Sequence, residues 1–177
     1  LSTDGSHGAI IPAEAVWTPK LGAAKLPGEY RAGYYYSTAD AQQIRHPQRS
    51  AHKQGGWLVL KQQLTAHKGD ASRGLTAFIN AAVHDADTNA VSAMQNAGVV
   101  YTGLMDARPQ DQIAAGFARI NMNDELNDGR SREYDAEVYY GIHAADWLSI
   151  RPNVQYIRHV GAYKNGENAW VGGIKFQ

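Results

Sequence analysis

Segments in which apolar and polar residues alternate dominate the sequence. The clearest runs from Tyr134 to Ile157, with the turn 144–146 in its middle. Apolar or aromatic residues take every second position of both arms, and mostly polar residues stand between them. A period of two places the two sets on opposite faces of a β-strand. The segment therefore predicts a hairpin with one apolar and one polar face.

Similar alternation predicts about nine strands. They cover residues 8–18, 28–37, 56–65, 74–84, 97–105, 111–122, 134–143, 147–157 and 169–177. Shorter and longer connections alternate between them, which is typical of an up-and-down membrane barrel with short periplasmic turns and longer external loops. The two faces are less clear in the segments 97–105 and 111–122. In the second of these, Arg119 falls in the stripe that Ile113, Ala115 and Phe117 begin. An odd strand number that starts at the external end predicts further strands upstream.

Composition narrows the class of protein. The 177 residues carry 17 Lys and Arg against 17 Asp and Glu, so the net charge is zero and no excess of cations favours nucleic acid. There is no cysteine, which excludes disulfides and thiol chemistry. No apolar run approaches the roughly 18 residues of a membrane-spanning helix. Leu1–Asp4 shows no initiator Met and no signal-type segment, so we expect a part of a longer polypeptide.

Several short motifs occur along the chain. They are DAEVYY at 135–140, DWLSIRPNVQYI at 146–157, NAWVGG at 168–173, GL at 103–104 with RPQD at 108–111, and GEYRAGYY at 28–35. This ordered set resembles the OprB-type carbohydrate-selective porins. The resemblance implies an all-β, antiparallel up-and-down transmembrane β-barrel in the bacterial outer membrane. Residues 1–177 would form the C-terminal part of one sixteen-stranded barrel domain, without its N-terminal strands. One departure is Gln177, which follows Phe176 where such barrels usually end in an aromatic residue.

In such a barrel the polar face lines a wet lumen. Its candidate lumen-lining and substrate-contact residues are Glu14, Glu29, Arg31, Trp57, Lys61, Gln63, Asp135, Glu137, Tyr139, Arg151, Asn153 and Lys175. Their polar groups can bond sugar hydroxyls, and Trp57 or Tyr139 can stack on apolar sugar faces. The predicted partners are small sugars in transit, outer-membrane lipid and lipopolysaccharide. A homo-oligomer is compatible with this interpretation, whereas nucleic acid, a cofactor, a metal and catalytic residues are not expected.

Two other classes of protein are alternative interpretations of the same pattern. A soluble β-sandwich or lipocalin-like small-molecule binding protein would turn the aromatic residues near the strand ends into a core; these are Tyr34, Tyr36, Trp147, Tyr156 and Trp170. An outer-membrane enzyme could use Asp135 and Glu137 as paired carboxylates. The segment 85–89 begins like a calcium loop but lacks the glycine and the final glutamate of that motif. A passive sugar channel remains the favoured prediction.

Overall fold

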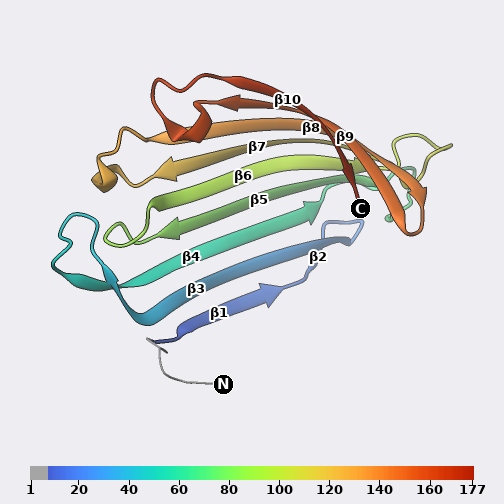
Figure 1. Cartoon of the computed structure of the whole chain (residues 1–177). Coiled ribbons are helices and arrows are strands. Elements are labelled where there is room, and N and C mark those ends of the chain that lie inside the picture. Colours follow the sequence, from blue (N-terminus) through green and yellow to red (C-terminus); the bar gives the residue numbers. More distant parts are fainter. Residues whose placement is uncertain (1–7) are drawn as a thin grey trace.

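The computed structural model describes residues 8–177, which form one antiparallel β-sheet (Figure 1). The expectation that this is part of a longer polypeptide came from Leu1–Asp4, which lie outside the described residues. The strands are β1 (Ile10–Trp17), β2 (Lys20–Leu21), β3 (Leu26–Gln42), β4 (Ser50–Gln63), β5 (Gly74–His84), β6 (Val91–Thr102), β7 (Gln112–Met122), β8 (Arg132–Ala145), β9 (Leu148–Arg158) and β10 (Ala169–Phe176). The all-β prediction is confirmed.

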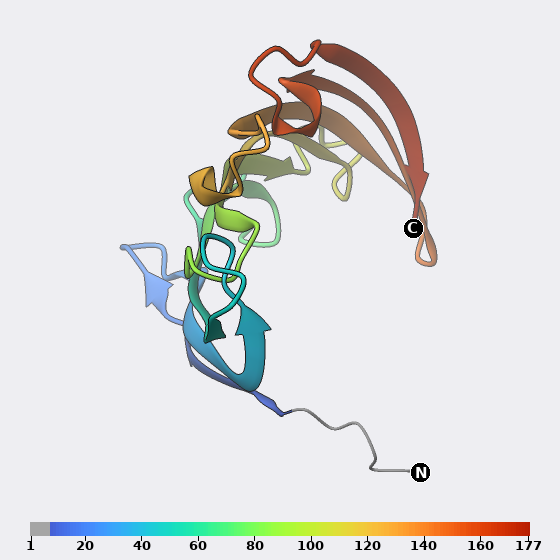
Figure 2. The same cartoon turned by 60° about the vertical axis from the view of Figure 1, so that its left-hand side comes forward.

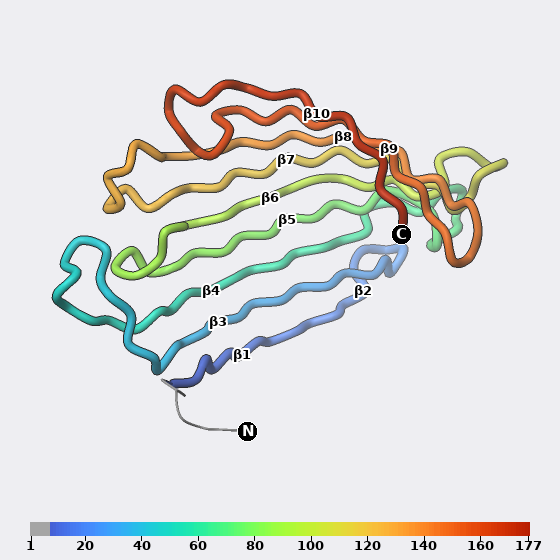
Figure 3. The backbone as a smooth tube through the Cα atoms, viewed as in Figure 1, coloured from blue at the N-terminus to red at the C-terminus, as the bar shows by residue number. Residues whose placement is uncertain are grey.

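Each long strand pairs with the next one along the chain. The order is β1-β3-β4-β5-β6-β7-β8-β9-β10, and the two-residue β2 pairs with β3 (Figure 3). This is the up-and-down topology that the sequence predicts. Within residues 8–177, no helix is long and apolar enough to cross a bilayer.

The predicted alternation of long and short connections is wrong. β3 continues to Gln42 and β4 begins at Ser50, so that the connection at 43–49 is no longer than those at 64–73 and 103–111. The extra residues at 38–42 and 50–55 are polar or small and include no large apolar side chain, yet their backbones still pair, with Asp40 opposite His52. Backbone hydrogen bonding does not require an apolar face, so the ladder continues beyond the segment that the pattern reveals.

The sheet is a single layer and lacks the packed core of a sandwich. Its buried apolar residues are only Leu26, Ala114, Met122 and Ala162 among the residues described. A sandwich would bury the facing sides of two sheets about 10 Å apart. Here both faces remain open, and the sheet curves from β1 to β10 so that one face is concave (Figure 2). The interpretation as a soluble sandwich or lipocalin-like binding protein is therefore not supported.

Gln62 and Arg119 interrupt apolar stripes without changing the register. The Gln62 amide nitrogen donates to three backbone carbonyls near the ends of β3 and β4, and its oxygen accepts the Tyr30 hydroxyl proton at 2.7 Å. Arg119 stays on the same face as its partner Tyr134, and its guanidinium carbon lies 5.8 Å from that ring's centre. No bulge reverses the faces of β7 against β8.

Pro152 is accommodated by a gap in one ladder. Its position in β9 pairs with Ile174 of β10, whereas the pairing of β9 with β8 stops at Asn153 and resumes at Ile150. Proline has no N–H to donate, so the missing hydrogen bond falls in this gap.

Two carboxylates fasten the connections at one end of the sheet. Asp111, which is 5% exposed, accepts hydrogen bonds from Arg108 at 2.8 and 3.1 Å, the Tyr140 hydroxyl at 2.7 Å and the His143 N–H at 2.9 Å. Asp106 bonds Lys68 and Arg73 of the neighbouring connection, and these two cations hold the pKa of its carboxyl below the ordinary value. The turn motif at 108–111 is thereby docked onto β8.

At the opposite end, Asp85 closes its own loop. Its carboxylate accepts the N–H groups of Gln54 and Thr88, each at 2.9 Å. The oxygens that a calcium loop would turn toward an ion are thus bonded to protein. Among residues 8–177, no cluster of three His, Asp or Glu side chains has the geometry of a metal site.

Candidate functional site

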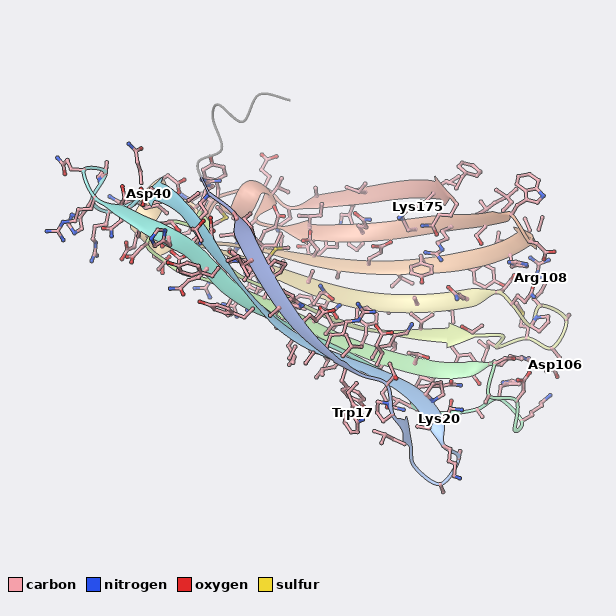
Figure 4. The ribbon with its side chains drawn as sticks, turned by 90° about the horizontal axis from the view of Figure 1, so that it is seen from below. Trp17, Lys20, Asp40, Asp106, Arg108 and Lys175 are labelled. Carbon is pink, nitrogen blue, oxygen red and sulfur yellow. The ribbon has the colours of Figure 1, made fainter. Side chains whose placement is uncertain are left out.

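The register places all twelve predicted residues on one face of the sheet. Directly opposed residues on neighbouring strands point to the same side. The pairs that link them are Glu29 with Lys61, Gly33 with both Glu14 and Trp57, Gln155 with Glu137, Asn153 with Tyr139, and Arg151 with Lys175. Trp17 belongs to the other set and projects from the convex side (Figure 4). The polar set therefore occupies the concave face.

One group of concave residues lies on β1, β3 and β4. The Glu14 carboxylate accepts the Trp57 indole N–H at 2.6 Å and lies 3.5 Å from the Arg31 guanidinium. Arg31 also donates to Glu29 at 2.7 Å. Gly33 makes this arrangement possible, since a Cβ there would stand 2.1 Å from the indole ring. The indole is thus fixed in place, with its Nε1 engaged and the ring lying over a glycine.

A second group lies on β8, β9 and β10. The Asn153 amide donates to Glu137 at 3.1 Å, and the Arg151 guanidinium carbon lies 5.3 Å from the centre of the Tyr139 ring. The Arg151 Nε atom is buried and has no hydrogen-bond partner among the described residues. Lys175 is directly opposite Arg151 in the ladder. The two groups are separated by β5, β6 and β7.

Two predicted residues have different surroundings. Gln63 donates to the backbone carbonyls of Thr65, Ala71 and Arg73, so its amide closes a turn. Asp135 forms no side-chain hydrogen bond within residues 8–177, and it borders a depression between the two groups.

That depression brings in residues that the sequence analysis missed. It measures about 270 Å³, and on the concave face Phe78, Asn96, Gly116, Ala118, Asp135, Glu137 and Gln155 surround it. The Phe78 ring covers Gly98, where a Cβ would stand 2.6 Å from the ring, and Asn80 donates to Asn96 at 2.7 Å. The position of Phe78 between Thr76 and Asn80 was the available signal, because all three share one strand face.

The convex face is apolar between two bands of aromatic residues. At the end with connections 64–73 and 103–111 the band holds Trp17, Tyr30, Tyr101 and Tyr140, and at the other end Tyr34, Tyr36, Tyr134, Tyr156 and Trp170. Between the bands lie apolar residues that are each more than 40% exposed, namely Leu58, Ile79, Val138 and Val154. The six residue steps from Tyr134 to Tyr140 span roughly 20 Å of strand. Such an apolar belt between aromatic girdles is what a bilayer requires of a barrel's outer surface.

Comparisons with known proteins agree with this geometry. The family model described as "Carbohydrate-selective porin, OprB family" matches residues 1–177. Porin B of Pseudomonas aeruginosa is 44% identical, over all of this chain and 46% of its own length. The high-pH structure of Pseudomonas putida OprB superposes with a TM-score of 0.92 at 44% identity, over 99% of this chain and 50% of that one. The low-pH structure of the same protein superposes with a TM-score of 0.73, over 97% of this chain and 46% of that one.

The chain thus spans about half the length of the proteins it matches. Its family model, its relatives and its amphipathic sheet are in agreement. The chain belongs to the OprB family of carbohydrate-selective porins, which are β-barrel proteins of the bacterial outer membrane.

Proposed function

We propose that this chain forms part of the wall of a channel through which small sugars diffuse passively. The observation that carries the proposal is the division of the sheet into a convex apolar face and a concave face of fixed polar and aromatic side chains. An apolar exterior suits lipid, and a polar interior suits water and hydrated solutes. Further strands, paired to the free edges of β1 and β10, would close the wall into a single barrel domain of sixteen strands, with this chain as its C-terminal part.

The charges of the concave face favour an uncharged solute. Among the twelve candidate residues, the carboxylates Glu14, Glu29, Asp135 and Glu137 are matched by Arg31, Lys61, Arg151 and Lys175. Balanced and interspersed charges give the lumen no strong preference for anions or cations. Carboxylates, guanidinium groups and amides can all bond hydroxyls, and Trp57, Phe78 and Tyr139 offer flat apolar surfaces.

Weak contact is sufficient for this activity. Passage requires that a solute bind well enough to enter and loosely enough to leave. No proton transfer or covalent step is needed, so the proposed activity includes no catalysis. The convex face would contact lipid and lipopolysaccharide, and a homo-oligomer stays a prediction.

Trp57→Ala should weaken sugar-dependent block of single-channel current. Its indole is held by Glu14 at 2.6 Å, so the ring is preorganised for stacking. We expect an increase of roughly two- to tenfold in the half-blocking sugar concentration, the equivalent of one aromatic stacking contact. The measurement is planar-bilayer recording of the full-length protein with mono- and disaccharides.

Trp170→Ala is the matched control, because Trp170 is a tryptophan of the convex face and is 74% exposed. Its loss should leave the block unchanged. Absence of any conductance by the wild-type protein would refute the channel. Equal block by wild type and Trp57→Ala would refute the contact assigned to Trp57.

A further inference from the structure

The convex face carries a cluster of basic residues just beyond one aromatic band. Tyr134 of β8 pairs with Arg119 of β7 on one side and with Arg158 of β9 on the other. Arg132 is two residues from Tyr134 along β8. Since paired residues share a face, and so do residues two apart on a strand, all four side chains lie on the convex side. Lys164 reaches the same place from the connection after β9. We call Arg119, Arg132, Arg158 and Lys164 the basic cluster.

Three members of the basic cluster line a depression together with an aromatic residue. The depression measures about 320 Å³ and is lined by Ser131, Arg132, Tyr134, Arg158, His159 and Lys164. The Arg119 guanidinium carbon lies 5.8 Å from the Tyr134 ring centre, and the His159 ring lies 6.4 Å from it. Cations around a concave surface raise the local concentration of anions.

The cluster has no anionic partner within the part of the chain that the structure describes. None of its four members forms an ion pair there, and Arg119 donates to the neutral Asn121 at 2.7 Å. The carboxylates nearby have other roles: Glu133 accepts the Gly161 N–H, and Asp128 pairs with Arg130. Asp124 lines an adjoining depression together with Arg119 and Arg132.

The cations of two connections at the other end of the sheet differ in this respect. At the end with connections 64–73 and 103–111, Lys68 and Arg73 are paired with Asp106, and Arg108 is paired with Asp111. These cations are neutralised by the protein itself. The basic cluster instead follows directly on Phe117, Tyr156 and Trp170, where the apolar belt ends. Cations at that level of a membrane protein can reach charged headgroups.

We propose that the basic cluster binds the phosphate groups of lipopolysaccharide in the outer leaflet. This proposal rests on the proposed function, because it needs the convex face to be in the membrane. Guanidinium groups bind phosphate through paired, charge-assisted hydrogen bonds. Four cations on three neighbouring strands and a loop match a headgroup with several negative charges better than a single phosphodiester. The connection at 159–168, which supplies Lys164, lies at the end of the sheet opposite the two-residue turn between β8 and β9. Short turns face the periplasm in outer-membrane barrels, so the end with the basic cluster faces outward.

The test compares lipid binding by the full-length protein and two double variants. The first, Arg132→Gln with Arg158→Gln, removes two members of the cluster. The second, Arg49→Gln with Lys53→Gln, removes two exposed cations at the same end of the sheet and serves as the control. Native mass spectrometry in detergent would measure the affinity for phosphorylated lipid A, its dephosphorylated form and phosphatidylglycerol.

We expect the first variant to lose roughly tenfold or more in affinity for phosphorylated lipid A, and the control to retain it. Wild type should prefer phosphorylated lipid A to both other lipids. Equal binding by the first variant and wild type would overturn the proposal, and so would equal binding of the dephosphorylated form or of phosphatidylglycerol by wild type. Sugar block of the current in the first variant shows that it is folded. It also separates a failure of this site from a failure of the channel.

Discussion

Replacing Val154 with arginine is expected to destabilise the protein in a bilayer by about 2–4 kcal/mol, the cost measured for a basic residue at the midplane of a barrel's lipid face. Val154 is 53% exposed on the convex face and pairs with Val138 on β8. A guanidinium there must enter hydrocarbon or pull water and headgroups toward it. The same residue on the concave face meets water and should cost little.

Gln155→Arg provides that comparison on the same strand. Gln155 pairs with Glu137 on the concave face, so the new cation gains a carboxylate neighbour. The two variants have the same added charge and differ by one position in β9. Urea unfolding in lipid vesicles, followed by tryptophan fluorescence, would give both free energies. Similar losses for the two variants would mean that the faces have been assigned to the wrong solvents.

Asp111→Ala is expected to cost about 2–4 kcal/mol, because it leaves several donors without their acceptor. Four hydrogen bonds converge on this carboxylate, which is 5% exposed. They join the turn at 108–111 to Tyr140 and His143 of β8. Loss of the carboxylate should therefore loosen the turn and the adjoining end of the β7–β8 pair. The temperature at which the folded band disappears in unheated gels would report the change.

The pH dependence of this site has a definite sign. Burial opposes ionisation of Asp111, but the hydrogen bonds from Arg108, His143 and Tyr140 outweigh it and lower the pKa of the carboxyl. A carboxyl with a lowered pKa stabilises the fold above its unfolded value of about 3.9, and this stabilisation is lost as the pH falls through the folded value. Below pH 4, wild type should therefore approach the stability of Asp111→Asn. A constant difference between the two proteins from pH 7 to pH 3 would contradict this assignment.

The faces of a strand could be predicted wherever one of them is clearly apolar. In the hairpin of β8 and β9, apolar and mostly polar residues alternate, and the two faces follow the prediction up to the register shift between His143 and Ala145. In β6, by contrast, Ala97 and Val99 face lipid while Gly98 and Val100 face the concave side. From residue 97 to residue 100 both faces carry only small or apolar residues, so alternation has no contrast to reveal.

The reason for small residues on the concave side of β6 lies on another strand. The Phe78 ring needs the space above Gly98, and this need becomes visible only when β5 and β6 are in register. The same holds for Trp57 and Gly33. A glycine that accommodates a neighbour's ring looks in sequence like any other glycine in a strand. Asn96 was missed because the predicted strand began at residue 97. Phe78 was missed although Thr76 and Asn80 share its face, whereas the polar face assigned to Glu137 and Arg151 agrees with the register.

Because every long strand joins the one that follows it, the wall is built from consecutive hairpins. Adding or deleting one hairpin changes the circumference and leaves all other pairings in place. A porin of this plan can therefore evolve a wider or narrower passage by duplication or loss of short gene segments, while the turn at 108–111 and its carboxylate remain intact.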